Sequence, residues 1–229
     1  EGLGELGYNP QWKGLLAADY GVPQLRRRVF VVGRRDGKKF VFPEPTHSGW
    51  SERDRKIDTS KIPHITAAQA FADLPRLVKA STDEIVDGRY GELAAELPPG
   101  QNYLWHTDRY GGRNDFEWRS RYWTFLLRLD PNRPSTTLQA QPGPWVGPFH
   151  WENVKISNGD QRARRLRVNE MLRLMSFPDD FKIDGTRADV QRQLGNAVPL
   201  ELGKAVIRAL MDQLGYLNRE QASRVVAFG

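Results

Sequence analysis

Apolar and polar positions alternate in short blocks along the chain, and the first blocks predict two strands. Val29–Val32 is an unbroken apolar run closed by Gly33, a pattern typical of a strand buried on both faces. A second strand is expected over residues 12–18, after a short helix over residues 1–7 that ends at a glycine. Two strands and one helix do not make a stable sheet, so we expect residues 1–45 to be the edge of a larger one.

Three later segments have the apolar spacing of amphipathic helices. The first begins at Thr66 and ends at Pro75, and the second covers residues 168–175 before Phe177-Pro178 stops it. The third begins at Pro199 and carries an apolar stripe made of Leu202, Ala205, Val206, Ala209, Leu210 and Leu214. A brief strand is also expected over residues 136–141.

Composition describes a globular protein that is basic and contains no cysteine. Hydrophobic residues make up 39% of the 229 residues and charged residues 27%, and no apolar stretch approaches the length of a membrane span. The net charge is +6 and arginine outnumbers lysine, which suits recognition of phosphates and guanine. The absence of cysteine excludes disulfides, cysteine-based metal sites and a thiol nucleophile. The chain starts at Glu1 and not at methionine, and we expect it to be an internal piece of a longer polypeptide.

Residues 101–133 interleave aromatic and basic side chains. Such a pattern indicates either a nucleic-acid surface or a small aromatic core with a solvated basic rim. The core interpretation is favoured for the aromatics, and the two interpretations are equally open for the arginines. The aromatics are Tyr103, Trp105, Tyr110, Phe116, Trp118, Tyr122, Trp123 and Phe125, and the arginines are Arg109, Arg113, Arg119, Arg121, Arg128 and Arg133.

Gln24, Arg26 and Arg28 follow one another at a spacing of two, immediately before the buried apolar run. In an extended chain all three side chains leave on one face. They form either a solvated basic edge or a set of guanidiniums aimed at an acceptor. His150 has no second ligand at metal-binding spacing, so we expect it to be structural or to contact phosphate, and we expect no metal site.

Three motifs, in order along the chain, resemble those of the DNA cytosine-5 methyltransferases. Residues 20–28 read Tyr-Gly-Val-Pro-Gln-Leu-Arg-Arg-Arg, similar to motif VIII of that family. Residues 164–181 combine a basic stretch, Glu170, an amphipathic helix and Phe-Pro-Asp-Asp-Phe, similar to motif IX, with Asn169 where the family usually has arginine. Residues 193–200 read Gln-Leu-Gly-Asn-Ala-Val-Pro-Leu, similar to motif X.

This resemblance implies an α/β fold in four parts. Residues 1–45 would supply edge strands of a Rossmann-like, S-adenosylmethionine-dependent methyltransferase sheet, and residues 46–163 a small, mixed, β-rich target-recognition domain. Residues 164–194 would form the scaffold of that domain, and residues 195–229 the helix that returns to the catalytic domain. The implied partners are double-stranded DNA and the N-terminal catalytic half, on the same chain or a separate subunit. No membrane partner is implied.

The resemblance also implies a chemistry in which cytosine is flipped out of the duplex and methylated at C5. Arg28 would then hydrogen-bond O2 of the flipped base, Arg26 would orient neighbouring groups, and Gln24 would support the turn. Asn196, Ala197 and Val198 would line the S-adenosylmethionine pocket. The residues expected to contact DNA are Arg109, Arg113, Arg119, Arg121, Arg164 and Arg165.

The family's Pro-Cys and Glu-Asn-Val motifs are absent from the 229 residues. We therefore expect this chain alone to transfer no methyl group. The resemblance implies a place in a bacterial restriction-modification system, in the cytoplasm and associated with the nucleoid. The alternative is a non-catalytic, sequence-specific DNA-binding module derived from such an enzyme.

Overall fold

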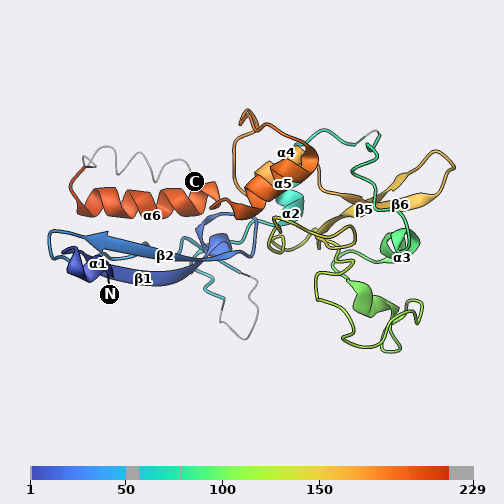
Figure 1. Ribbon diagram of the computed structural model, residues 1–229, viewed down its shortest axis with the longest axis horizontal. Helices are drawn as coiled ribbons and strands as arrows, with labels where there is room; N and C mark the ends of the chain where they lie inside the picture. Colours follow the sequence, from blue (N-terminus) through green and yellow to red (C-terminus); the bar gives the residue numbers. More distant parts are fainter. Residues whose placement is uncertain (1, 50–56, 78, 217–229) are drawn as a thin grey trace.

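The computed structural model describes residues 2–49, 57–77 and 79–216, and these form three two-stranded sheets and several short helices (Figure 1). The strands are β1 (Asn9–Leu16), β2 (Arg27–Arg34), β3 (His47–Ser48), β4 (Ile62–Pro63), β5 (Phe149–Lys155) and β6 (Gln161–Arg165). The α-helices are α1 (Gly2–Glu5), α2 (Ala67–Phe71), α3 (Gly91–Glu96), α4 (Val168–Leu174), α5 (Arg187–Asn196) and α6 (Leu200–Gln213). Two 3-10 helices cover Ala17–Tyr20 and Tyr103–His106. None of the helices within the described ranges is long and apolar enough to cross a membrane.

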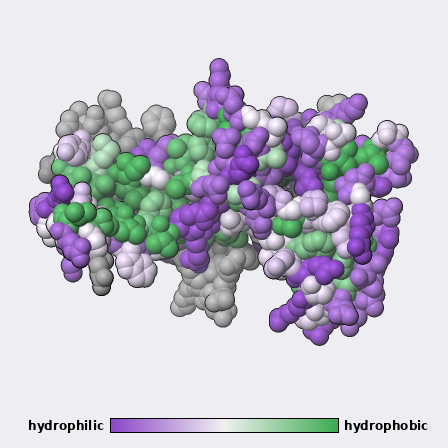
Figure 2. Space-filling model, in the orientation of Figure 1, coloured by the Kyte–Doolittle hydropathy of each residue, from purple (hydrophilic) through white to green (hydrophobic). Residues whose placement is uncertain are grey.

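β1 and β2 pair antiparallel at one end of the molecule, and α6 covers only one face of the pair (Figure 1). Phe30 and Val32 point toward α6 and pack against its apolar side. The opposite face carries Trp12, Val29 and Val31, which are 76%, 67% and 58% exposed. Apolar side chains accordingly gather on the surface at the β1, β2 and α6 end of the molecule (Figure 2). The expected burial of the β2 run on both faces is therefore wrong for this structure, because nothing described lies on that second face.

The first and last helices agree in part with the sequence prediction. α1 ends at Glu5, before the predicted Gly7, and the first residue of the predicted helix, Glu1, lies outside the described residues. Gly7, with φ of +78°, makes the turn into β1 that the glycine predicted. α6 begins after Pro199 and buries Leu202 and Val206 from the predicted stripe, whereas Leu214 is 44% exposed.

A central cluster joins the two ends of the molecule. α2, α4 and α5 pack their apolar faces together with Leu129 and Leu138. The predicted Thr66 start of α2 is correct, since the Thr66 hydroxyl accepts from Gln69 N and the Gln69 side chain accepts from Thr66 N. Residues 136–141 form no strand, contrary to expectation. An isolated bridge joins Gln24 to Ser135, just before them, and Leu138 N donates to the Gln24 side chain and not to a neighbouring strand.

The second lobe, made of α3, residues 97–127 and the β5–β6 hairpin, is built around an aromatic core that lies between α3 and the hairpin. Tyr103, Phe116, Phe125 and Phe149 are buried in one cluster, and the first three contact one another edge to face. This confirms the core interpretation for Tyr103, Phe116 and Phe125. It is wrong for Tyr110, Tyr122 and Trp123, which are exposed. Residues 46–163, which were expected to be mixed and β-rich, hold β3, β4, β5 and the start of β6, but within them residues 97–148, all of which the structure describes, have one 3-10 helix and no strand.

Candidate functional site

Gln24 and Arg26 leave the chain on the same side and are fully buried between the central helices. The Gln24 amide donates to the carbonyl oxygen of Leu174 at 3.1 Å and accepts from Leu138 N at 3.3 Å. The Arg26 guanidinium donates to the carbonyl oxygen of the same Leu138 at 3.1 Å. Of the three side chains predicted to share a face, the structure brings Gln24 and Arg26 together, and both tie the segment before β2 to the 136–141 segment.

Arg26 also holds the corner between α5 and α6. Its Nη2 donates to the carbonyl oxygens of Gly195 and Ala197, the latter at 3.1 Å, on either side of Asn196. Gly195 is required here by close approach, since a Cβ at this position would lie 2.3 Å from the Ala140 Cα. Two backbone segments that are distant in sequence, at Leu138 and at Gly195 to Ala197, therefore converge on one guanidinium.

Arg28 stays outside this buried network. Its Nη1 donates to the carbonyl oxygen of Arg27 at 2.8 Å, and it forms no ion pair within the described part of the chain. The side chain is half-buried and borders a hollow of about 300 Å³, whose other lining residues are Leu16, Leu25, Arg27 and Thr137. Burial lowers the pKa of Arg28 from its usual value. A charged group that is partly desolvated and has few partners is suited to bind a polar ligand.

Asn196, Ala197 and Val198 lie at the accessible surface of the corner that Arg26 holds. Asn196 is exposed, Ala197 is half-buried and Val198 is 44% exposed. The Asn196 amide makes no hydrogen bond to another described residue, so it can both donate and accept. An exposed apolar side chain beside an uncommitted amide can form one wall of a pocket for a ligand with polar and apolar parts.

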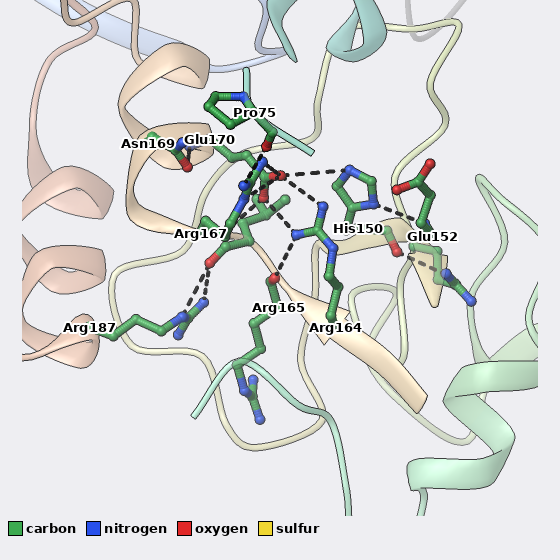
Figure 3. Close-up of polar contacts among 11 residues, drawn as sticks. Pro75, His150, Glu152, Arg164, Arg165, Arg167, Asn169, Glu170 and Arg187 are labelled. Atoms are coloured by element: carbon green, nitrogen blue, oxygen red, sulfur yellow. Dashed lines mark hydrogen bonds and ion pairs between the residues drawn. The ribbon is translucent and has the colours of Figure 1, made fainter. Parts of the chain in front are cut away.

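A buried ionic cluster fixes the second lobe to the central helices (Figure 3). Glu170 of α4 accepts two hydrogen bonds from Arg164 of β6, both at 2.8 Å, and two more from the side chain of Arg167. Arg167 also reaches the carbonyl oxygen of Pro75 at 2.8 Å. Burial would raise the pKa of Glu170, but the hydrogen bonds and charge of Arg164 outweigh it, and the pKa lies below its usual value.

Arg164 does not fit the DNA-contacting role expected from the sequence. It is only 2% exposed and its guanidinium is committed to Glu170, so a phosphate cannot reach it. His150 is also buried, at 3% exposed; its Nδ1 accepts from Glu152 N at 2.9 Å and its Nε2 lies 3.8 Å from Glu170. Of its two expected roles, the structural one holds. Burial and the charge of Arg164 lower the pKa of His150 to about 3, so the imidazole is neutral at ordinary pH.

The other arginines expected to contact DNA differ in their surroundings. Arg109 and Arg119 are exposed and lie 4.3 Å and 5.8 Å from the ring of Trp118. Arg121 is exposed as well, whereas Arg113 pairs with Glu96. Arg165 is half-buried and borders a hollow of about 460 Å³ together with Arg187, Arg192 and the loop at 140–144. Sequence reasoning did not single out Arg187 or Arg192.

Comparison with known proteins shows that the chain is similar to DNA methyltransferases. Residues 1–212 match the family described as C-5 cytosine-specific DNA methylase, and the chain belongs to that family. It is 70% identical over 217 residues to the Type II methyltransferase M.SacI of Streptomyces achromogenes, a match that covers 95% of this chain and 55% of the relative. It is 32% identical to M.NgoFVII of Neisseria gonorrhoeae, covering 90% of this chain and 52% of that one. The chain therefore spans about half the length of these relatives.

Solved structures of methyltransferases share the fold at low identity. The DNMT2 variant of Spodoptera frugiperda superposes with a TM-score of 0.54 at 13% identity, over 91% of this chain and 60% of that one. The methyltransferase EhMeth of Entamoeba histolytica gives a TM-score of 0.53 at 13% identity, over 93% and 56%. The mixed α/β architecture with small sheets is thus that of methyltransferases.

Proposed function

We propose that this chain is the part of a DNA cytosine-5 methyltransferase that recognises the target and supplies one wall of the active site and one side of the S-adenosylmethionine pocket. The observation that carries the proposal is the unequal use of two arginines in one motif. The Arg26 guanidinium donates hydrogen bonds to three backbone carbonyls. Arg28 borders a hollow and makes one hydrogen bond, to the carbonyl of the neighbouring Arg27. A solvated basic edge would leave both in water.

In this proposal Arg28 contacts the extruded cytosine. A guanidinium donates to a pyrimidine carbonyl oxygen, and its fixed charge favours the negative charge that develops when the ring is attacked. Arg26 acts as a positioning residue, because it holds the backbone around Asn196 at a fixed place relative to the start of β2. Gln24 supports the same junction through Leu138 and Leu174.

The residues of the α5–α6 corner fit one side of an S-adenosylmethionine site. Val198 offers an apolar surface to the flat adenine or the methionine chain, and the Asn196 amide can bind a polar edge. S-adenosylmethionine would supply the methyl group when bound. The chain's own residues would hold it through backbone and amide contacts at a corner that Arg26 keeps rigid.

The exposed face of β1 and β2 supports the proposal that further sheet or helix packs here. Trp12 stands opposite Val31 in the ladder and next to Val29, so the three side chains form one apolar patch. Patches of this kind mark interaction sites. We propose that the cofactor-binding half covers this face, that residues 46–163 recognise DNA, and that residues 164–194 support them. Residues 217–229 of the proposed last part lie outside the described residues.

Complementation tests the function. The full chain would be mixed with the segment of the Streptomyces achromogenes relative that this chain does not match, and transfer of a labelled methyl group to DNA measured. We expect transfer by the mixture and none by either part alone. Transfer by this chain alone would contradict the proposal. A mixture that binds DNA tightly but never transfers a methyl group would favour the non-catalytic DNA-binding module.

A further inference from the structure

Tyr122 and Trp123 are adjacent aromatic side chains that the fold leaves in solvent. Tyr122 is 85% exposed and Trp123 is 59% exposed. Large aromatic rings contribute most to stability when they are buried, and Phe125, two positions further on, is buried in the core of the second lobe. The chain therefore has a buried and two exposed aromatic side chains within four residues, and the exposed pair lies outside the aromatic core.

The backbone that carries the pair is fixed from behind. The Asn102 amide donates to the carbonyl oxygen of Trp123 at 2.8 Å. The Tyr103 hydroxyl donates to the carbonyl oxygen of Arg121 at 2.8 Å and accepts from Arg121 N at 3.1 Å. Asn102 and Tyr103 are themselves buried, at 2% and 1% exposed. The backbone that carries the two rings is thus held in place by the aromatic core, which reduces the entropy lost when the rings bind.

Unpaired positive charge lies on the same turn. Arg119 and Arg121 come just before the pair in sequence, both are exposed, and neither forms an ion pair with any residue that the structure describes. Arg113, further back on the lobe, is by contrast neutralised by Glu96. Aromatic faces beside uncompensated arginines are the combination that binds nucleic acids, in which rings stack on bases and guanidiniums hold phosphates.

The other exposed apolar patch of the molecule has a different character. Trp12, Val29 and Val31 lie together on one sheet face, with Arg27 at the end of the same row, and such an apolar group is typical of the core of a protein–protein interface. The green to yellow-green segment that carries the pair lies away from β1 and β2, in the half of the molecule that holds α3, β5 and β6 (Figure 1). Its charge complements DNA and not an apolar protein surface.

We propose that Tyr122 and Trp123 stack on bases of the DNA duplex at or beside an opened step, while Arg119 and Arg121 bind the flanking phosphates. This inference rests on the proposed function, since it names how the recognition part touches its DNA. The proposal assigns stacking on bases to the two aromatic rings and phosphate binding to the two arginines, and these two kinds of contact depend differently on salt. Phosphate contacts release counterions and weaken as salt rises, whereas stacking on bases does not.

Binding of the full chain to short fluorescein-labelled duplexes of mixed sequence, followed by anisotropy over a range of salt, tests the inference. Replacing both rings, in Tyr122→Ala with Trp123→Ala, should weaken binding about ten-fold or more at every salt concentration without changing the salt slope. Arg119→Ala with Arg121→Ala should lower the slope by about two. Trp123→Phe, which keeps a ring, should retain most of the affinity.

Tyr216→Ala is the matched control, because Tyr216 is a 70% exposed aromatic beyond α6, and it should bind as the unaltered chain does. Thermal unfolding should be unchanged in all these variants, since the side chains removed are exposed. If the aromatic double variant binds DNA normally, or changes only self-association, the stacking inference is overturned. The proposed role in DNA recognition is then still supported if the arginine double variant lowers the salt slope. If the unaltered chain binds no DNA at low salt, the proposed function fails as well.

Discussion

Replacing Arg26 should destabilise the protein far more than replacing Arg28. Arg26→Ala removes hydrogen bonds to the carbonyl oxygens of Leu138, Gly195 and Ala197, and leaves these buried acceptors unpaired. Hydrogen bonds to a charged group contribute about 1.5–3 kcal/mol each, so the gross loss is about 4–9 kcal/mol. Removing a buried charge returns several kcal/mol of desolvation cost, and we expect a net loss of about 3 kcal/mol.

Urea unfolding followed by tryptophan fluorescence measures this difference. Arg28→Ala is the internal control, because Arg28 donates only to the neighbouring Arg27 carbonyl and its removal should cost less than about 1 kcal/mol. Arg26→Lys should fall between the two, since an ammonium cannot span three separated acceptors. Equal midpoints for the Arg26 and Arg28 alanine variants would refute the assignment of Arg26 as the residue that holds the corner.

Two further predictions concern packing and pH. Gly195→Ala should lower the free energy of unfolding in urea by about 3 kcal/mol, because the added Cβ would lie 2.3 Å from the Ala140 backbone. Gly203→Ala is the control: its Cβ would first meet Val198 at 3.7 Å, and it should stabilise α6 by about 0.5–1 kcal/mol. An unchanged stability in Gly195→Ala would contradict the close approach. The pKa of His150 is about 3 in the folded chain, against 6.5 for an ordinary imidazole. Between these two pH values the unfolded chain binds a proton that the folded chain does not. The free energy of unfolding should therefore fall as the pH decreases from 6.5 toward 3, by up to about 1.4 kcal/mol per pH unit. The dependence of Tm on pH in this range should be weaker in His150→Asn than in the unaltered chain. The same dependence in both proteins would show that His150 is not buried in its neutral form.

The motifs predicted which parts of the chain meet, and the hydrophobic pattern predicted the helices that carry them. The spacing of Gln24 and Arg26 was enough to place both on one face, and the apolar stripe after Pro199 was enough to predict α6. These signals are local or periodic, so they can be read without knowing the fold. The division of work between Arg26 and Arg28 could not be predicted, because it depends on carbonyls more than a hundred residues away.

Two elements were missed although the sequence carried their signals. Asn158-Gly159 is a strong hairpin turn, Gly159 has φ of +91°, and the strands on either side are β5 and β6. Thr186 and Asp189 form the capping box that begins α5. The apolar runs beside both motifs are short and surrounded by polar residues, so the hydrophobic pattern alone did not predict the β5–β6 hairpin or α5.

The fate of the arginines was the least predictable feature. Arg164 and Arg128 are each 2% exposed, while Arg119 and Arg121 lie at the surface, and nothing in the local sequence distinguishes the two kinds. Arg164 is buried because Glu170, on the following helix, folds back on it. Long-range partners of this kind decide which basic residues are available to DNA.

The most direct test of the central claim is methyl transfer to DNA by the complemented enzyme carrying Arg28→Ala. We expect transfer to fall at least a hundred-fold, the usual loss when a donor to developing negative charge is removed, while DNA affinity changes less than about two-fold. Arg208→Ala, which removes an exposed positive charge from α6, should leave both quantities unchanged. Full activity in the Arg28 variant would contradict the claim that this guanidinium holds the extruded cytosine.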